Sequence, residues 1–172
     1  NLEKNLVVET KPGAEGSRML VGSGGNLLDQ QIVIADPETF ANLGNGRVGE
    51  IWVSGPSVAQ GYWKRDDLTK QVFQARLDDG RGPFLRTGDL GFLLDGELFV
   101  TGRLKDLIII RGVNHYPQDI EDTVQAAHPD VVPSGGAAIV VGDEGNEQLV
   151  IVQETVRRRD VDVAEITKTI RR

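Results

Sequence analysis

Two short runs of the chain place opposite charges inside turn-forming sequence. The run at 86–91 (RTGDLG) carries Asp89, whose ionised carboxylate only accepts hydrogen bonds and can take both hydroxyls of a ribose. The run at 102–106 (GRLKD) carries Arg103, which stays charged at any physiological pH and can donate hydrogen bonds to a ribose oxygen or a phosphate. Between them, residues 95–96 (DG) are typical of a tight β-hairpin turn. Such a hairpin would bring Asp89 and Arg103 together, and we therefore predict a nucleotide site where they meet.

The elements that would position these runs are mostly short strands. Residues 49–54 (GEIWVS) alternate in the way of a half-buried strand, with Ile51 and Val53 facing inward and Glu50 and Trp52 facing outward. Further elements are expected as strands at 19–22, 31–35, 84–85, 90–94 and 97–101, and as a short helix at 66–74 capped by its two aspartates. This half of the chain reads as a compact β-rich subdomain.

The character of the chain changes near Lys105. Residues 107–110 (LIII) predict a buried strand, and Pro117 suits the first turn of a helix, where its missing N–H costs nothing. Pro129 ends that helix. The elements expected next are strands at 137–141 and 148–153, joined by a loop at 142–146, and a last helix that includes residues 163–170.

Four motifs, in chain order, resemble those of the adenylate-forming superfamily, which includes acyl-CoA synthetases, luciferases and peptide-synthetase adenylation domains. They are the runs at 49–63 (GEIWVSGPSVAQGYW), 86–89 (RTGD), 102–106 (GRLKD) and 108–121 (IIIRGVNHYPQDIE). Four ordered motifs at fitting spacing are far more specific than a single Gly-Asp or Gly-Arg pair. The resemblance runs from about Gly22 to the end, and the sequence NHYPQDIE at 114–121 is most similar to the fatty acyl-AMP ligase branch.

The resemblance implies an α+β fold made of two parts. Residues 1–103 would be the β-rich end of the large adenylation domain, and residues 106–172 the small α+β lid domain, which is incomplete. Residues 104–105 would be the hinge on which the lid swings between the adenylation and thioester-forming states. Lys105 suits a solvent-exposed hinge, because its long stem stays hydrated while the backbone rotates.

The resemblance also assigns roles to individual residues. Asp89 would bind the ribose, and Arg103 would contact the ribose or a phosphate. Gly112 would lie in the loop that faces the tunnel of the thiol acceptor in the second state. Apart from the resemblance, Gly112 suits a close backbone approach or a turn that needs a positive φ.

The implied activity is that of an ATP-dependent ligase, with Mg²⁺ screening the phosphates. It would activate a fatty acid as the acyl-adenylate and pass the acyl group to the phosphopantetheine thiol of an acyl carrier protein. Two alternatives remain open, a fatty acyl-CoA ligase and a non-enzymatic module that binds a carrier protein. A Rossmann-type nucleotide binder is excluded, because no Gly-x-Gly-x-x-Gly run follows a strand and opens a helix.

Each candidate also has a plainer interpretation. Asp89 could cap backbone amides of its own turn, and Arg103 could make a surface salt bridge worth under about 1 kcal/mol. Lys105 could be a solvated turn lysine. His115 could act as a general base, although a histidine packed at a strand-to-helix turn is favoured over that and over a metal ligand. The arginines at 157–159 are favoured as a solvated loop over a docking patch for an acidic carrier protein.

The composition excludes several classes of protein. A net charge of −7 argues against nucleic-acid binding as a main role, since that needs a basic face. The chain has no cysteine, and therefore no disulfide, thiol nucleophile or cysteine metal site. No apolar run approaches the roughly 20 residues of a membrane span, and no signal peptide opens the chain. We therefore expect a cytoplasmic protein.

Parts of the family's machinery are not expected in these 172 residues. In the resembled family, a Ser/Thr/Gly-rich phosphate loop, the adenine-binding segment and the acyl pocket precede the matching region. The lysine that bonds the carboxylate and α-phosphate would lie beyond Arg172. The Gly-Lys context that this role requires is found at none of Lys4, Lys11, Lys64, Lys70 and Lys168. We therefore expect this chain alone not to catalyse adenylation.

Overall fold

A computed structural model describes residues 5–14, 17–27, 29–110, 112–142, 146–158 and 160–171 of the chain. The chain divides into two compact units, Asn1–Lys105 (unit 1) and Asp106–Arg172 (unit 2), and each is described by itself. Parts of three predicted features lie outside the described residues, namely Arg111 of the fourth motif, residues 143–145 of the expected loop, and Arg159 of the arginine run.

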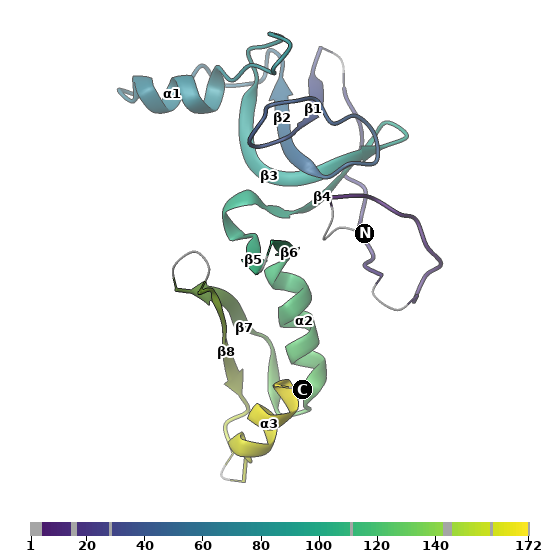
Figure 1. Cartoon of the computed structure of the whole chain (residues 1–172), viewed down its shortest axis with the longest axis vertical. Coiled ribbons are helices and arrows are strands. Elements are labelled where there is room, and N and C mark those ends of the chain that lie inside the picture. The colour runs from purple at the N-terminus through teal and green to yellow at the C-terminus, as the bar shows by residue number, and fades with distance from the viewer. Residues whose placement is uncertain are drawn as a thin grey trace. The chain divides into compact units, whose positions relative to one another are not determined.

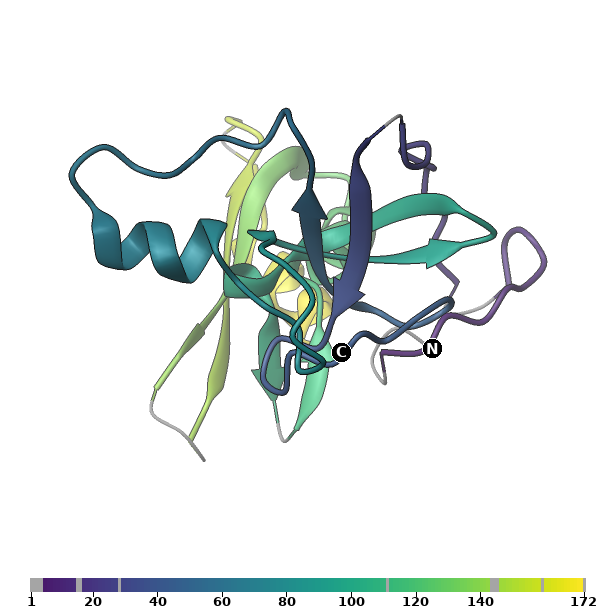
Figure 2. The same cartoon turned by 90° about the horizontal axis from the view of Figure 1, so that it is seen from above.

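Unit 1 is built on a four-stranded antiparallel sheet with the order β1-β2-β3-β4 (Figure 1). The strands are β1 (Gln31–Ala35), β2 (Gly49–Ser54), β3 (Leu85–Leu94) and β4 (Glu97–Arg103). The helix α1 (Asp66–Phe73) lies in the chain between β2 and β3, and Figure 2 shows it projecting to one side of the sheet. Asp66 and Asp67 lie in its first turn, where they complement the helix dipole, and Arg65 rather than an aspartate is the N-cap.

The core of unit 1 forms around Trp52, which is fully buried. Its cluster contains Val33 and Ala35 of β1, and Leu77 and Phe84 from the segment before β3. The Trp52 ring centroid lies 6.2 Å from that of Phe84 in a tilted arrangement, which favours aromatic packing. This core fixes β2 between β1 and β3.

The outward orientation expected for Glu50 and Trp52 is wrong. Both side chains are buried, and so is Ile51 between them. The physical reason is that β2 is an inner strand with both faces covered, so a period of two does not separate core from solvent there. A charged residue inside this strand therefore has to find its partners within the protein.

Unit 2 places α2 (Pro117–Ala127) alongside the hairpin of β7 (Val131–Val141) and β8 (Gln148–Thr155) (Figure 1). Its other elements are β5 (Ile108–Ile110), β6 (Val113–His115) and α3 (Val163–Ile170). β7 starts earlier than expected, because residues 132–135 (VPSG), which resemble a turn, form an irregularity within the strand. The expected α+β class is confirmed. Among the helices that the structure describes, none is long and apolar enough to cross a membrane.

Candidate nucleotide site

Asp89 and Arg103 lie opposite each other on β3 and β4. The turn between these strands has Asp95 and Gly96 at φ values of 49° and 84°, the left-handed conformations that a two-residue hairpin turn requires. Arg103 Nε lies 3.4 Å from Asp89 Oδ1, and the side chains are 61% and 40% exposed. The hairpin therefore brings the two predicted residues together at a solvent-accessible edge.

Asp89 lies between two irregularities in the sheet. On one side, Glu50 pairs with Leu90 and Trp52 pairs with Arg86, so residues 87–89 face the single residue Ile51. On the other side, the register between β3 and β4 shifts between Leu90 and Gly91. Bulges bend a strand and re-aim its side chains, and they are frequent beside active sites.

Gly88 precedes Asp89 with a φ of 75°, a conformation that strains any residue with a side chain. A Cβ atom built on Gly88 would meet nothing within 4 Å. The glycine is therefore required by the backbone turn and not by crowding. The open space beside it leaves the backbone next to Asp89 accessible to a ligand.

Side chains replace the interrupted backbone ladder at this point. Arg86 Nε donates a hydrogen bond to Glu50 Oε2 at 2.9 Å, and the Gly88 N–H donates to Glu50 Oε1 at 3.2 Å. The Thr87 hydroxyl donates to the Ile51 carbonyl at 2.7 Å and accepts from the Asp89 N–H at 3.1 Å. These contacts tie Arg86, Thr87 and Gly88 to β2, and Asp89 to Thr87.

Glu50 is the residue that the sequence analysis missed. Its side chain is 2% exposed, and Arg86 Nη2 lies 2.7 Å from its Oε2. The Arg86 guanidinium is also 5.1 Å from the Phe40 ring centroid and 5.5 Å from that of Trp52, within cation–π range. The available signal was a carboxylate between Gly49 and Ile51 in a strand-like run, because a charge within a strand needs a partner if the strand is buried.

The other two predicted site residues lie elsewhere in the chain. Lys105 is exposed in the middle of η2 (Leu104–Asp106), a single 3₁₀ turn that follows β4. Gly112 lies in the turn between β5 and β6 with a φ of 75°, so the expected positive φ is confirmed. Gly112 belongs to unit 2, and the residues that the structure brings together are Asp89 and Arg103.

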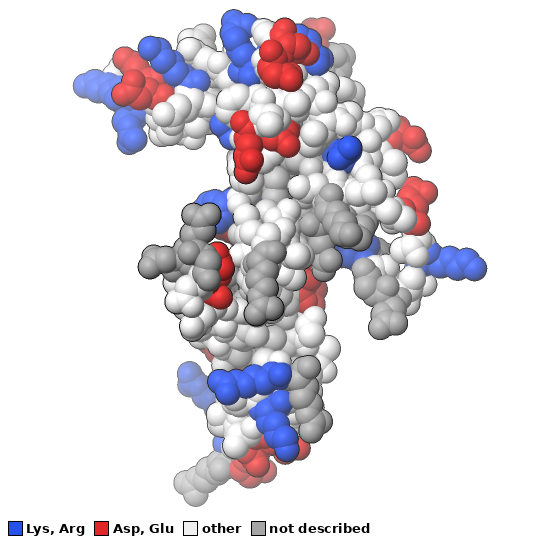
Figure 3. All heavy atoms as spheres, in the orientation of Figure 1, with Lys and Arg blue, Asp and Glu red and all other residues white. Residues whose placement is uncertain are grey.

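No group of three or more His, Asp or Glu side chains that could hold a metal ion gathers among the described residues. His115 is half-buried at the end of β6. Arg158 from the arginine run lies 2.6 Å from Asp130, so it is partly occupied within unit 2. Figure 3 shows Lys and Arg side chains gathered over the end of unit 2 that carries α3.

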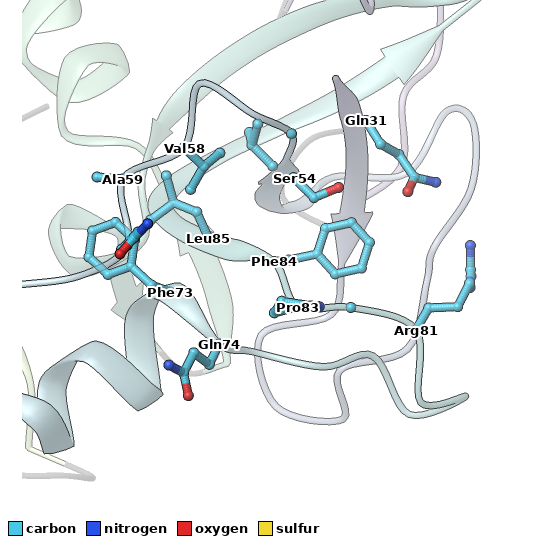
Figure 4. Close-up of a pocket in the computed structure, with 14 residues that line it drawn as sticks. Gln31, Ser54, Val58, Ala59, Phe73, Gln74, Arg81, Pro83, Phe84 and Leu85 are labelled. Atoms are coloured by element: carbon cyan, nitrogen blue, oxygen red, sulfur yellow. The ribbon is translucent and has the colours of Figure 1, made fainter. Parts of the chain in front are cut away.

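A separate pocket of about 790 Å³ lies in unit 1 beside the end of α1 (Figure 4). Its walls come from Gln31, the end of β2, the loop that follows β2, and the segment 81–85. Asp89 and Arg103 do not line it, so it is not part of the candidate nucleotide site. Asp36, whose pKa is held below its ordinary value chiefly by a hydrogen bond from the Thr39 backbone N–H, also lies outside the site.

The chain is similar to several known proteins. Residues 105–172 match the family described as "Disco-interacting protein 2-like, AMP domain". The medium-chain-fatty-acid–[acyl-carrier-protein] ligase JamA of Moorena producens is 49% identical over 99% of this chain and 30% of its own length. The chain spans between about a fifth and a third of the length of the curated relatives that it matches.

Two solved structures give the same result for the fold. A chain from a study of fatty acyl-adenylate ligases from E. coli and L. pneumophila aligns with a TM-score of 0.74 and 30% identity, covering 98% of this chain and 28% of that one. ATP-bound MatB from Rhodopseudomonas palustris aligns with a TM-score of 0.68 and 34% identity, covering 91% of this chain and 30% of that one. The chain belongs to the adenylate-forming superfamily and corresponds to a fragment of its members.

Proposed function

We propose that this chain is the C-terminal part of an ATP-dependent fatty acyl-AMP ligase that passes its product to an acyl carrier protein. The observation that carries the proposal is the pairing of Asp89 with Arg103 at an accessible sheet edge. The Asp89 carboxylate accepts from both ribose hydroxyls, and the Arg103 guanidinium donates to the ribose or a phosphate. The ion pair between them is weak enough to be exchanged for these contacts.

The reaction has two steps. In the first, a fatty acid carboxylate attacks the α-phosphate of ATP, an acyl-phosphate bond forms, and pyrophosphate leaves. In the second, a thiol attacks the acyl carbon and AMP leaves. The residues described here contribute by binding and orienting the nucleotide, since none of them is placed as a nucleophile. Mg²⁺ would enter with the nucleotide, and we assign it no ligand in this chain.

Between these steps, unit 2 would act as the lid and move relative to unit 1. We propose residues 1–103 as the end of the large domain, 104–105 as the hinge and 106–172 as the lid. The 3₁₀ turn at Lys105 supports this proposal, because its exposed side chain lets the backbone rotate without breaking a packed contact. The Gly112 turn would then present its open backbone to the incoming thiol arm.

A phosphopantetheine thiol of an acyl carrier protein is the proposed acceptor, and the name of JamA supports it. CoA is the alternative acceptor, because Asp89 and Arg103 would serve either ligase equally. ATP as substrate favours a cytoplasmic location. We expect the 172-residue chain alone to bind nucleotide weakly and not to form adenylate, since it spans 30% of the length of JamA.

The test uses the intact protein that carries this chain, with ATP, Mg²⁺ and fatty acids, and with either CoA or a phosphopantetheinylated carrier protein. With CoA, mass spectrometry should detect accumulating acyl-AMP. With the carrier protein, it should detect the carrier protein acylated on its phosphopantetheine thiol. Rapid formation of acyl-CoA would move the assignment to the CoA ligases. If no adenylate forms under any condition and an Asp89→Ala variant behaves as the parent does, the remaining alternative would be a non-enzymatic module that binds a carrier protein.

A further inference from the structure

The position of Asp89 depends on more than the strand that carries it. Asp89 is paired with Arg103 on β4, but on the side of β2 residues 87–89 face the single residue Ile51, so the regular backbone ladder is interrupted there. On that side the contacts come from side chains, and the buried carboxylate of Glu50 makes two of them. The other two run through the Thr87 hydroxyl, directly before the turn at Gly88.

Glu50 connects the residue before this bulge, Arg86, with its middle residue, Gly88. One of its oxygens receives the Arg86 guanidinium, and the other receives the Gly88 backbone N–H. Only an ionised carboxylate presents two acceptors in this arrangement. A glutamine would keep one carbonyl oxygen and would turn its NH₂ group toward a second donor, either Arg86 or the Gly88 N–H. The geometry of the bulge therefore requires the charge as well as the shape of Glu50.

Arg86 in turn holds Glu50 in place. Its guanidinium lies within cation–π range of Phe40 and Trp52, so the aromatic core fixes its plane. The pair is largely withdrawn from water, with Glu50 2% exposed, and such pairs keep their geometry when both partners are present. The core around Trp52 is thus connected through Arg86 and Glu50 to the residue before Asp89.

We infer that Glu50, held by Arg86, is a positioning residue of the nucleotide site, which fixes Gly88 and so aims the Asp89 carboxylate at the ribose hydroxyls. The inference rests on the proposed function. Glu50 touches neither nucleotide nor fatty acid in this role. Its loss should therefore change how well the enzyme reads the ribose, without changing how it binds the acyl substrate.

The test compares ATP with 2′,3′-dideoxy-ATP in pyrophosphate release by the intact protein with a saturating fatty acid. The parent should prefer ATP, and Asp89→Ala should abolish most of that preference. Glu50→Gln should lower the ratio of kcat/KM for ATP to kcat/KM for 2′,3′-dideoxy-ATP by about tenfold, the effect of losing one charge-assisted hydrogen bond. It should raise the KM for ATP and leave the KM for fatty acid unchanged, whereas a merely structural role would leave the ratio as in the parent.

The matched control is Asp79→Asn, which removes a carboxylate from the exposed Asp79–Arg81 pair of the same unit and should not change the ratio. If Glu50→Gln does not fold, Arg86→Lys decides, since it keeps the charge but loses the planar contact with the rings. That variant should lower the ratio at least twofold, as the lost charge-assisted bond weakens its hold on Glu50.

Two kinds of failure can be told apart. A parent-like ratio in Glu50→Gln, or in Arg86→Lys where the first does not fold, would overturn the inference as long as Asp89→Ala loses its preference. A parent that treats the two nucleotides alike, or an Asp89→Ala variant that keeps the preference, would instead refute the proposed nucleotide site itself.

Discussion

Replacing Gly88 by alanine should separate the strain of the bulge from the fold of the hairpin. Gly88 has a φ of 75°, and alanine in the left-handed region costs roughly 1–2 kcal/mol. No atom lies within 4 Å of the new Cβ, so the cost is conformational and includes no clash. We therefore expect the free energy of unfolding to fall by about 1–2 kcal/mol.

The hairpin supplies a matched control in Gly96→Ala. Gly96 has a φ of 84°, and its Cβ would also meet nothing within 4 Å, so the strain should be about the same. It lies in the turn between β3 and β4, at the other end of these strands from Asp89. The two variants thus carry the same perturbation, one beside the candidate site and one away from it.

The assay is the KM for ATP in pyrophosphate exchange by the intact protein, with thermal unfolding of each variant measured in parallel. Gly88→Ala should raise this KM by about fivefold or more, which corresponds to about 1 kcal/mol of binding free energy. Gly96→Ala should lose similar stability and keep the KM of the parent. Equal stability losses with an unchanged KM in both variants would refute the reasoning, because Gly88 would then not border the nucleotide.

Three further outcomes are expected. Hydrogen bonding, chiefly from the Thr39 N–H, lowers the pKa of Asp36 in the folded protein. The stability that ionised Asp36 contributes is therefore fully present above its unfolded pKa of about 4 and is lost as the pH falls through its folded pKa. The difference in thermal midpoint between the parent and Asp36→Asn should shrink from pH 6 to pH 3. Arg158→Ala removes both 2.6 Å hydrogen bonds from the mostly buried Asp130 and should cost about 1–2 kcal/mol in denaturant unfolding; no loss would mean that water replaces the arginine. Lys105→Pro fixes one backbone dihedral of the proposed hinge and should slow acyl transfer more than pyrophosphate exchange, and equal effects on both would argue against the hinge.

The hairpin that carries the candidate site could be predicted from the sequence, and the reason is local. The Asp95-Gly96 dipeptide selects a two-residue turn, and the turn sets the register that places Asp89 opposite Arg103. The same reasoning found the helix that starts at Pro117, because a first-turn proline also acts locally. Features that depend on residues close in sequence could thus be predicted from the sequence alone.

The bulge beside Asp89 could not be predicted in this way. It depends on how β2 and β3 align, and their paired residues are about 40 positions apart in the chain, as with Glu50 and Leu90. The alternation of residues in β2 favoured a solvent-facing Glu50, because a period of two assumes that only one face of the strand is covered. The inner position of β2 became known only with the order of the strands in the sheet. The same limit applies to residues 132–135, which look like a turn and lie within β7.

Two arginine–carboxylate pairs in unit 1 illustrate how burial assigns different tasks to the same chemistry. The pair of Arg103 and Asp89 is exposed, spans 3.4 Å, and contributes under about 1 kcal/mol, so a ligand can replace it at little cost. The pair of Arg86 and Glu50 spans 2.7 Å and is mostly buried, and removing one partner from such a pair costs about 3–5 kcal/mol. Only the first pair is therefore available for binding, and the second is suited to hold the backbone on which the first is placed.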